Sequence, residues 1–130
     1  MVVDPISNFI IKLKNASLAG KALVSVPHSK MIESIATILK DEGFITSFTK
    51  KGKKVVKTLE VEVKYEEGKP AITDVARISK FSKRVYKGAK EIKPVRNGFG
   101  ALILTTPKGI LTDKAARKQN VGGEALFKIW

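Results

Sequence analysis

The sequence contains no cysteine and a single histidine, His28, and these two facts exclude several kinds of chemistry. Without cysteine the chain can form no disulfide, no thiol nucleophile and no Cys-ligated zinc site. One histidine cannot build a His-based metal site or a Cys–His pair, and we expect it on the surface near a helix start. The acidic residues are scattered and form no pair suited to acid–base catalysis. The sequence therefore predicts a protein that is not an enzyme and that needs no metal and no cofactor.

Long apolar runs are also missing, as is any pattern of a secretory leader. The chain begins Met1-Val2-Val3-Asp4-Pro5, without a basic segment followed by an apolar one. No apolar run approaches the roughly 20 residues of a membrane-spanning helix. There is no P-loop pattern, and Gly98-Phe99-Gly100 precedes an expected strand, so it is not a dinucleotide fingerprint. We therefore expect a cytoplasmic protein without a membrane partner.

Positive charge is what the sequence has in excess. It carries 25 Lys and Arg against 12 Asp and Glu, a formal net charge of +13, while 43% of its residues are hydrophobic. These positive charges repel one another in the folded chain unless a polyanion neutralises them. The candidate partners are nucleic acid, an anionic membrane surface or an acidic protein. Residues 77–96 concentrate the charge around Tyr86, with Glu91 as their only acid. The basic residues of this stretch are Arg77, Lys80, Lys83, Arg84, Lys87, Lys90, Lys93 and Arg96.

This density favours a surface for a phosphate backbone over a merely solvated charge run. An exposed Tyr86 could stack on an unpaired base. Its sequence context fits a core position equally well, so the role of this one residue stays open.

Apolar spacing predicts an α-β-α-β-β lobe over residues 1–65. Asp4 and Pro5 open a first helix that stops at Gly20, and residues 24–27 form a short strand. Ser29 caps a second helix that closes at residues 41–43. The period then changes from 3.6 to 2, which predicts strands over 44–49 and 59–65, separated by a polar turn at 50–54.

Residues 66–130 are expected to form a second, strand-rich lobe, so the fold class is α+β. The pattern predicts a turn at 66–70, a strand over 71–79 and a basic irregular stretch with one helical turn near Glu91. A fully apolar strand over 101–104, a turn at 105–109 and a strand at 110–111 follow. A short helix over 114–119 is expected to break at Gly122-Gly123, before a last strand over 124–130.

The turn after the apolar strand holds two hydroxyls, a proline, a cation and a glycine: Thr105, Thr106, Pro107, Lys108 and Gly109. Hydroxyls and free backbone groups can bind ribose, phosphate or base edges, and glycine allows close approach of a ligand. Taken alone, however, the pentad is typical of an ordinary hairpin turn.

Several motifs together, in this order, resemble those of the family of the eighth protein of the small ribosomal subunit. The resemblance runs the length of the chain and is carried by Asp4-Pro5-Ile6, Lys14-Asn15-Ala16, Pro27-His28-Ser29-Lys30, Glu42-Gly43-Phe44-Ile45, Arg84-Val85-Tyr86, Gly98-Phe99-Gly100, residues 105–113, Ala116-Arg117, and Gly122-Gly123-Glu124 with Trp130. It implies two small α/β lobes and direct binding to an irregular helical stem in the central domain of 16S ribosomal RNA, early in assembly of the subunit. Neighbouring small-subunit ribosomal proteins are implied as further partners.

The same resemblance changes the interpretation of the 105–109 turn from an ordinary hairpin to an RNA contact. The family's recognition loop maps onto Thr105, Thr106 and Gly109, its tyrosine onto Tyr86, and its terminal motif onto Gly122, Gly123 and Glu124. With the basic residues, the expected RNA-binding set is Lys30, Arg84, Tyr86, Lys87, Lys90, Thr105, Thr106, Pro107, Lys108, Gly109, Gly122, Gly123 and Glu124.

The sequence departs from the family's pattern at three places. Thr105 stands where serine is usual, Phe81-Ser82 stands where many members have Pro-Gly, and Phe127 replaces a common cysteine. The added methyl of Thr105 could crowd a close contact, and the change at 81–82 could alter the approach of the basic stretch.

Three other classes of function compete with a ribosomal RNA-binding protein. An enzyme on a nucleic-acid substrate lacks a metal, thiol or carboxylate set to support it. A peripheral membrane protein would need an amphipathic helix with a basic face, and a DNA-binding regulator would need a helix-turn-helix that we do not find. The sequence leaves open whether the protein also binds a messenger RNA that mimics the ribosomal site.

Overall fold

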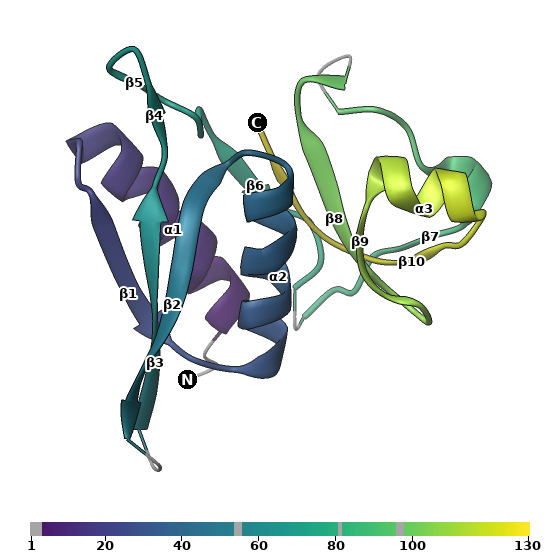
Figure 1. The fold of residues 1–130 in the computed structure, drawn as a ribbon. Coiled ribbons are helices and arrows are strands. Elements are labelled where there is room, and N and C mark those ends of the chain that lie inside the picture. The colour runs from purple at the N-terminus through teal and green to yellow at the C-terminus, as the bar shows by residue number, and fades with distance from the viewer. Residues whose placement is uncertain (1–3, 54–55, 81, 96–97) are drawn as a thin grey trace. The chain divides into compact units, whose positions relative to one another are not determined.

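The computed structural model describes residues 4–53, 56–80, 82–95 and 98–130, with side chains omitted at 53 and 56 (Figure 1). Contacts divide the chain into one unit ending at Thr73 and a second unit, Asp74–Trp130. The fold is α+β, as predicted, with helices and antiparallel sheets in both units. The sequence-based division at residue 65 remains a prediction about domains.

The first helix, α1 (Pro5–Ala19), has the predicted ends. The side chain of Asp4 accepts a hydrogen bond from the backbone N–H of Ser7 at 3.2 Å, and Pro5 occupies the first turn, where no N–H is needed. Gly20 ends the helix at φ +71°, a conformation that glycine adopts without strain. The buried side chains recur three and four residues apart, so one face of the helix enters the core.

A three-stranded antiparallel sheet completes this unit together with α2 (Lys30–Asp41). Its order is β1 (Leu23–Pro27), β3 (Val56–Val63) and β2 (Ile45–Lys53). Ser29 caps α2 as predicted, its hydroxyl accepting from the N–H of Ile32 at 3.1 Å. His28 lies beside this helix start, with Nε2 3.1 Å from Oε1 of Glu33. A two-stranded hairpin, β4 (Tyr65–Glu66) and β5 (Lys69–Pro70), turns at 67–68 as expected.

The lysine-rich segment 50–54 was wrongly predicted to be a turn. Strand β2 continues to Lys53, and its pairing with β3 runs from Lys50 opposite Leu59 to Lys53 opposite Val56. Lysine side chains are tolerated in this part of the ribbon because Lys50 and Lys51 are exposed to water. Lys54, the last residue of the predicted turn, lies outside the described residues.

The second unit is built on a five-stranded sheet in which β10 (Gly123–Ile129) is central. It pairs with β8 (Ala101–Thr106), β6 (Val75–Arg77) and β7 (Tyr86–Lys87), and β9 (Gly109–Thr112) pairs with β8. The strand predicted over 71–79 is only β6, because the N–H of Ala71 bonds to Lys64 O whereas that of Asp74 bonds to Trp130 O. The irregular stretch contains the predicted helical turn, the 3-10 helix η1 (Ala89–Glu91), and also β7, which was not predicted.

One short helix, α3 (Asp113–Gln119), covers this sheet. Thr112 caps it, and Asn120 ends it at φ +55°, so the helix stops before Gly122. Asp113 is buried: its carboxylate accepts from the N–H of Leu102 at 3.2 Å and from Arg117 at 3.1 Å. The helix is therefore fastened to β8, the strand that leads to the 105–109 turn.

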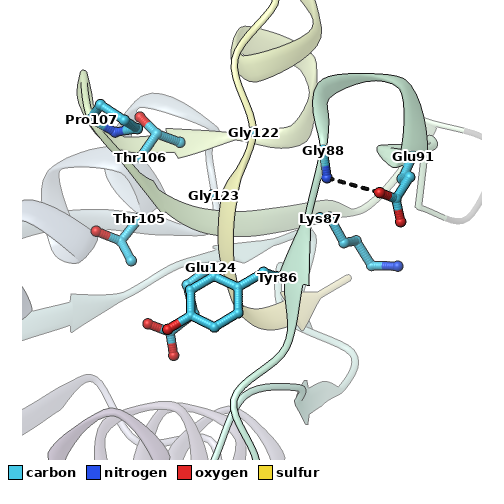
Figure 2. A pocket seen from close by; sticks show the side chains of 10 residues that line it. All are labelled: Tyr86, Lys87, Gly88, Glu91, Thr105, Thr106, Pro107, Gly122, Gly123 and Glu124. Atoms are coloured by element: carbon cyan, nitrogen blue, oxygen red, sulfur yellow. Dashed lines mark hydrogen bonds between the residues drawn. The ribbon is translucent and has the colours of Figure 1, made fainter.

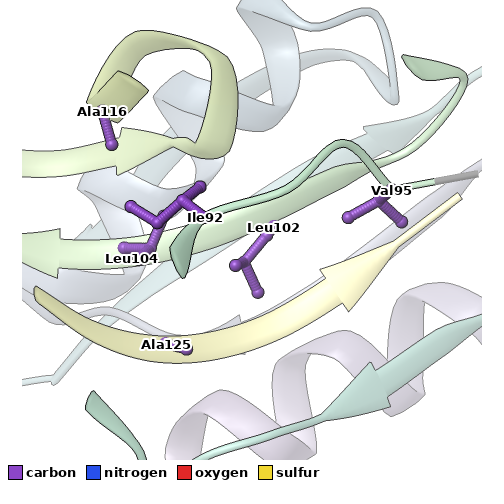
Figure 3. Close-up of a cluster of buried hydrophobic side chains, with 6 residues drawn as sticks. All are labelled: Ile92, Val95, Leu102, Leu104, Ala116 and Ala125. Atoms are coloured by element: carbon purple, nitrogen blue, oxygen red, sulfur yellow. The ribbon is translucent and has the colours of Figure 1, made fainter. Parts of the chain in front are cut away.

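A compact hydrophobic cluster fixes the relative positions of β8, β10, α3 and η1 (Figure 3). Its buried members are Ile92, Val95, Leu102, Leu104, Ala116 and Ala125. Ile92 follows η1 directly, so burial of its side chain anchors the basic stretch to the sheet. Burying a side chain of this size stabilises a fold by about 1.5–3 kcal/mol.

Candidate nucleic-acid interface

An open hollow of about 580 Å³ lies on the second unit where β7, β10 and the end of β8 meet (Figure 2). It is lined by Tyr86, Lys87, Gly88, Glu91, Thr105, Thr106, Pro107, Gly122, Gly123 and Glu124. Eight of these ten residues belong to the RNA-binding set expected from the sequence. Segments about 20 residues apart in the chain are thus brought to one surface by the pairing of β10 with both neighbours.

Gly122 and Gly123 are required by the close packing of strands around the hollow. A Cβ on Gly122 would lie 2.3 Å from Lys87 O, and one on Gly123 would lie 2.1 Å from Thr105 O. Both distances are impossible for non-bonded atoms, so only glycine permits β7 and β8 to approach this end of β10. The two glycines therefore allow the strand arrangement that places Tyr86 and Thr105 on either side of Glu124.

The hydroxyl of Thr106 is used inside the β8–β9 turn. It donates to Gly109 O at 2.8 Å and accepts from the N–H of Lys108 at 3.1 Å. Gly109 has φ +107°, which favours glycine, and no atom lies within 4 Å of its Cβ position. Thr106 and Gly109 thus hold the turn in shape, and Lys108 is exposed at its tip.

Thr105 and Tyr86 present groups to the hollow that the described structure does not use internally. The Thr105 hydroxyl has no hydrogen-bond partner among the described residues, and its side chain lines the hollow. Tyr86 is 68% exposed as a residue, which decides the question that the sequence left open: this tyrosine is not a core residue. An exposed ring and an available hydroxyl on one concave surface are suited to stacking and hydrogen bonding.

Glu124 supports the site through a partly buried hydrogen-bond network. Its Oε2 accepts from the hydroxyl of Ser79 at 2.5 Å and lies 3.1 Å from a guanidinium nitrogen of Arg84. Ser79, which is fully buried, also accepts from the N–H of Val85 at 3.0 Å. These contacts fix the segment that leads into Tyr86. Ser79 was not foreseen, because nothing in the sequence distinguishes it from a surface serine.

The other expected residues differ in their relation to the hollow. Lys87 lines it, and Lys90 is exposed in η1 close by in sequence. Two further lining residues, Gly88 and Glu91, were not expected; the Glu91 carboxylate accepts from the N–H of Gly88 at 3.2 Å and closes the η1 turn. Lys30 is the exposed first residue of α2, in the first unit. Arg96 and Phe81 lie outside the described residues.

Within the described ranges no cluster of three or more His, Asp or Glu residues could hold a metal ion. None of the described helices is long and apolar enough to span a membrane.

Comparisons with known proteins point to one family. The sequence profile described as ribosomal protein S8 matches residues 4–130. The chain is 47% identical over 130 residues to the small ribosomal subunit protein uS8 of Oleidesulfovibrio alaskensis, covering all of both chains. It is 46% identical over 129 residues to that of Mycoplasmopsis agalactiae, covering 99% of this chain and 98% of the relative. For Caulobacter sp. the values are 42% over 128 residues, with 98% and 97% covered.

Proposed function

Because the chain belongs to the ribosomal protein S8 family and is thus a structural, non-enzymatic constituent of the small ribosomal subunit, we propose that its hollow binds an irregular stem in the central domain of 16S ribosomal RNA. Binding of ribosomal RNA is the general role of this family. The finer proposal concerns which RNA feature enters the hollow and which side chains recognise it.

Electrostatics supplies the general attraction in this proposal. Lys87, Lys90 and Lys108 lie on or next to the segments that border the hollow, and the whole chain carries +13. Each cation placed near a phosphate releases counterions, so affinity rises but carries little sequence information. This part of the binding should weaken steeply as salt increases.

Specificity must come from the groups that face the hollow. A regular A-form stem hides base edges in its deep major groove, whereas an unpaired or displaced base exposes both its face and its edges. The Tyr86 ring offers a stacking surface, and the Thr105 hydroxyl lies on the same hollow to hydrogen-bond to ribose or a base edge. The observation that carries the proposal is this pairing of an exposed ring with an internally unused hydroxyl.

The remaining expected residues act indirectly in this scheme. Thr106 and Gly109 shape the turn, Gly122 and Gly123 permit the close strand packing, and Glu124 orients Arg84. Binding of the protein to this stem would help to stabilise the small subunit, together with the neighbouring ribosomal proteins. Nothing in the hollow distinguishes a messenger RNA that copies this stem from the stem itself.

The test compares the affinity of the protein for a central-domain fragment of 16S ribosomal RNA with its affinity for a scrambled RNA of equal length, across a salt series. We expect the fragment to keep a large advantage at high salt, where phosphate attraction is screened. Equal binding of both RNAs, vanishing together as salt rises, would refute recognition by the hollow.

A further inference from the structure

The outer half of the β2–β3 ribbon is a second basic surface, separate in the chain from the hollow. Strand β1 accompanies β3 as far as His28, whose N–H bonds to Lys57 O at 3.0 Å. Beyond that point β2 and β3 continue as two strands, with Gly52 opposite Lys57 and Lys53 opposite Val56. Figure 1 shows this ribbon running past the end of β1.

Lysines dominate this ribbon and acids are absent from its outer half. Residues 50–57 include Lys50, Lys51, Lys53, Lys54 and Lys57 and no Asp or Glu. Among those with described side chains, Lys50, Lys51 and Lys57 are all exposed. Like charges at such short separations repel one another, and an anionic partner would relieve that repulsion.

The three described lysines point to both faces of the ribbon. Opposed residues of an antiparallel pair share a face and neighbours alternate, so Lys50 and Lys57 lie on one face and Lys51 on the other. Lys51 forms an ion pair with Glu60 at 3.1 Å, but the lysine side chain is 56% exposed. An ion pair that is this exposed to water is weak, so Lys51 can still bind another anion. Glu60 is the only described acid that forms an ion pair with any of the three.

We propose that this ribbon is a second RNA contact, in which Lys50, Lys51 and Lys57 bind phosphates independently of the hollow. The inference rests on the proposed function only in that the chain binds RNA. It adds a second place on the chain at which the RNA is held. The contact reads no sequence, because ammonium groups on flexible stems bind phosphates as point charges.

The chemistry of the ribbon favours RNA over the other polyanions. A membrane-surface element needs exposed apolar side chains that enter the lipid, and none of the large exposed hydrophobic side chains that the structure describes lies on β2 or β3. An acidic protein partner would meet an interface with an apolar or aromatic centre, which the described side chains of the ribbon's outer half do not offer. Cations on both faces of a narrow ribbon instead suit two strands of phosphates on either side.

The first experiment measures the salt dependence of RNA binding for two matched triple variants of the full chain. One carries Lys50→Gln, Lys51→Gln and Lys57→Gln; the control carries Lys21→Gln, Lys40→Gln and Lys69→Gln, which remove three exposed lysines from the same unit. Each lost phosphate contact lowers the slope of log affinity against log salt by about 0.7–0.9. For the ribbon variant we expect this slope to fall by about 2–3 with both the central-domain fragment and the scrambled RNA.

The control variant has the same net charge as the ribbon variant. Its slope should nevertheless differ from the wild-type slope by no more than the contribution of about one phosphate contact. Equal slopes for the two triple variants would overturn the inference, because any effect would then come from net charge alone. A wild-type protein that does not prefer the central-domain fragment would count against the hollow, while the ribbon would still be judged by the slopes.

A second experiment locates the RNA directly. Because the chain contains no cysteine, a single introduced cysteine is a unique attachment site for an iron chelate that cleaves nearby RNA. Lys51→Cys reports on the ribbon, Lys108→Cys on the hollow's turn, and Lys40→Cys serves as the background. Cleavage from position 51 above that background, at nucleotides different from those reached from 108, supports the second contact. Cleavage from 108 with only background from 51 rules it out, and cleavage from 51 alone would instead contradict the role of the hollow.

Discussion

Thr105 and Thr106 are adjacent hydroxyl residues with different environments, and this difference makes a sharp prediction. Valine replaces threonine with almost no change of shape, so Thr105→Val and Thr106→Val each remove little more than a hydroxyl. The Thr105 hydroxyl has no hydrogen-bond partner within the described protein, whereas that of Thr106 makes two bonds in the turn. We therefore expect the first change to affect binding alone and the second to affect folding as well.

The magnitudes follow from the number of bonds. One hydrogen bond contributes a net ~0.5–1.5 kcal/mol, so Thr105→Val should weaken binding to the central-domain fragment roughly two- to twelvefold. Its unfolding midpoint should match that of the wild type. Thr106→Val loses two exposed turn bonds and should lower the free energy of unfolding by about 1 kcal/mol. It should also weaken specific binding, because the turn that adjoins Thr105 loosens.

The assay pairs fluorescence anisotropy on labelled RNA with thermal unfolding of the same preparations. Scrambled RNA provides the control, and its affinity should be unchanged by either substitution because no charge is altered. If Thr105→Val binds the specific fragment as tightly as the wild type, the Thr105 hydroxyl is not a contact. If Thr106→Val weakens binding with no loss of stability, the Thr106 hydroxyl acts as an RNA contact and not as a support of the turn.

Three further predictions concern the ring, the charge and the packing around the hollow. Tyr86→Ala should cost ~1–3 kcal/mol in specific binding while Tyr86→Phe keeps most of it; equal losses in the two variants would show that the hydroxyl, not stacking, matters. Lys90→Ala should lower affinity for specific and scrambled RNA alike and flatten the salt slope by about one contact, so a selective loss of specific binding in titrations would contradict its placement as a general phosphate contact. Gly123→Ala should destabilise the fold by about 1–3 kcal/mol, because its Cβ would lie 2.1 Å from Thr105 O. Gly100→Ala, whose Cβ would lie 2.8 Å from Val95 Cγ1, is a matched control that should destabilise without changing specificity in the same binding and unfolding measurements.

Helices were predicted well from sequence because their signals are local. Asp4, Pro5 and Gly20 fix both ends of α1 through hydrogen bonds and backbone angles that involve only neighbouring residues. The prediction of a turn at 50–54 was wrong because it, too, relied on local signals. Polarity and glycine indicate a turn locally, but the pairing of β2 with β3 depends on a partner strand that composition does not reveal.

The site was predictable in its members but not in their roles. Resemblance to a family supplied Thr105, Thr106, Tyr86 and the Gly-Gly pair, and their roles as RNA contacts remain predictions. Local sequence could not show that the hydroxyl of Thr106 bonds inward while that of Thr105 faces the hollow. Nor could it show that Ser79 is buried against Glu124, because that contact joins residues 45 apart in the chain.

The central position of β10 has a consequence for the time at which binding can begin. Strand β10 is synthesised after every other strand of its sheet, yet β6, β7 and β8 all pair with it. Until residues 123–129 have left the translating ribosome, Tyr86 and Thr105 have no common strand that holds them on its two sides. A nascent or truncated chain therefore carries the basic residues without the hollow, and under the proposed function it would attract RNA without recognising it. If the hollow recognises RNA as proposed, recognition is coupled to the completion of the unit, which would keep unfinished chains from occupying the specific site on a growing subunit.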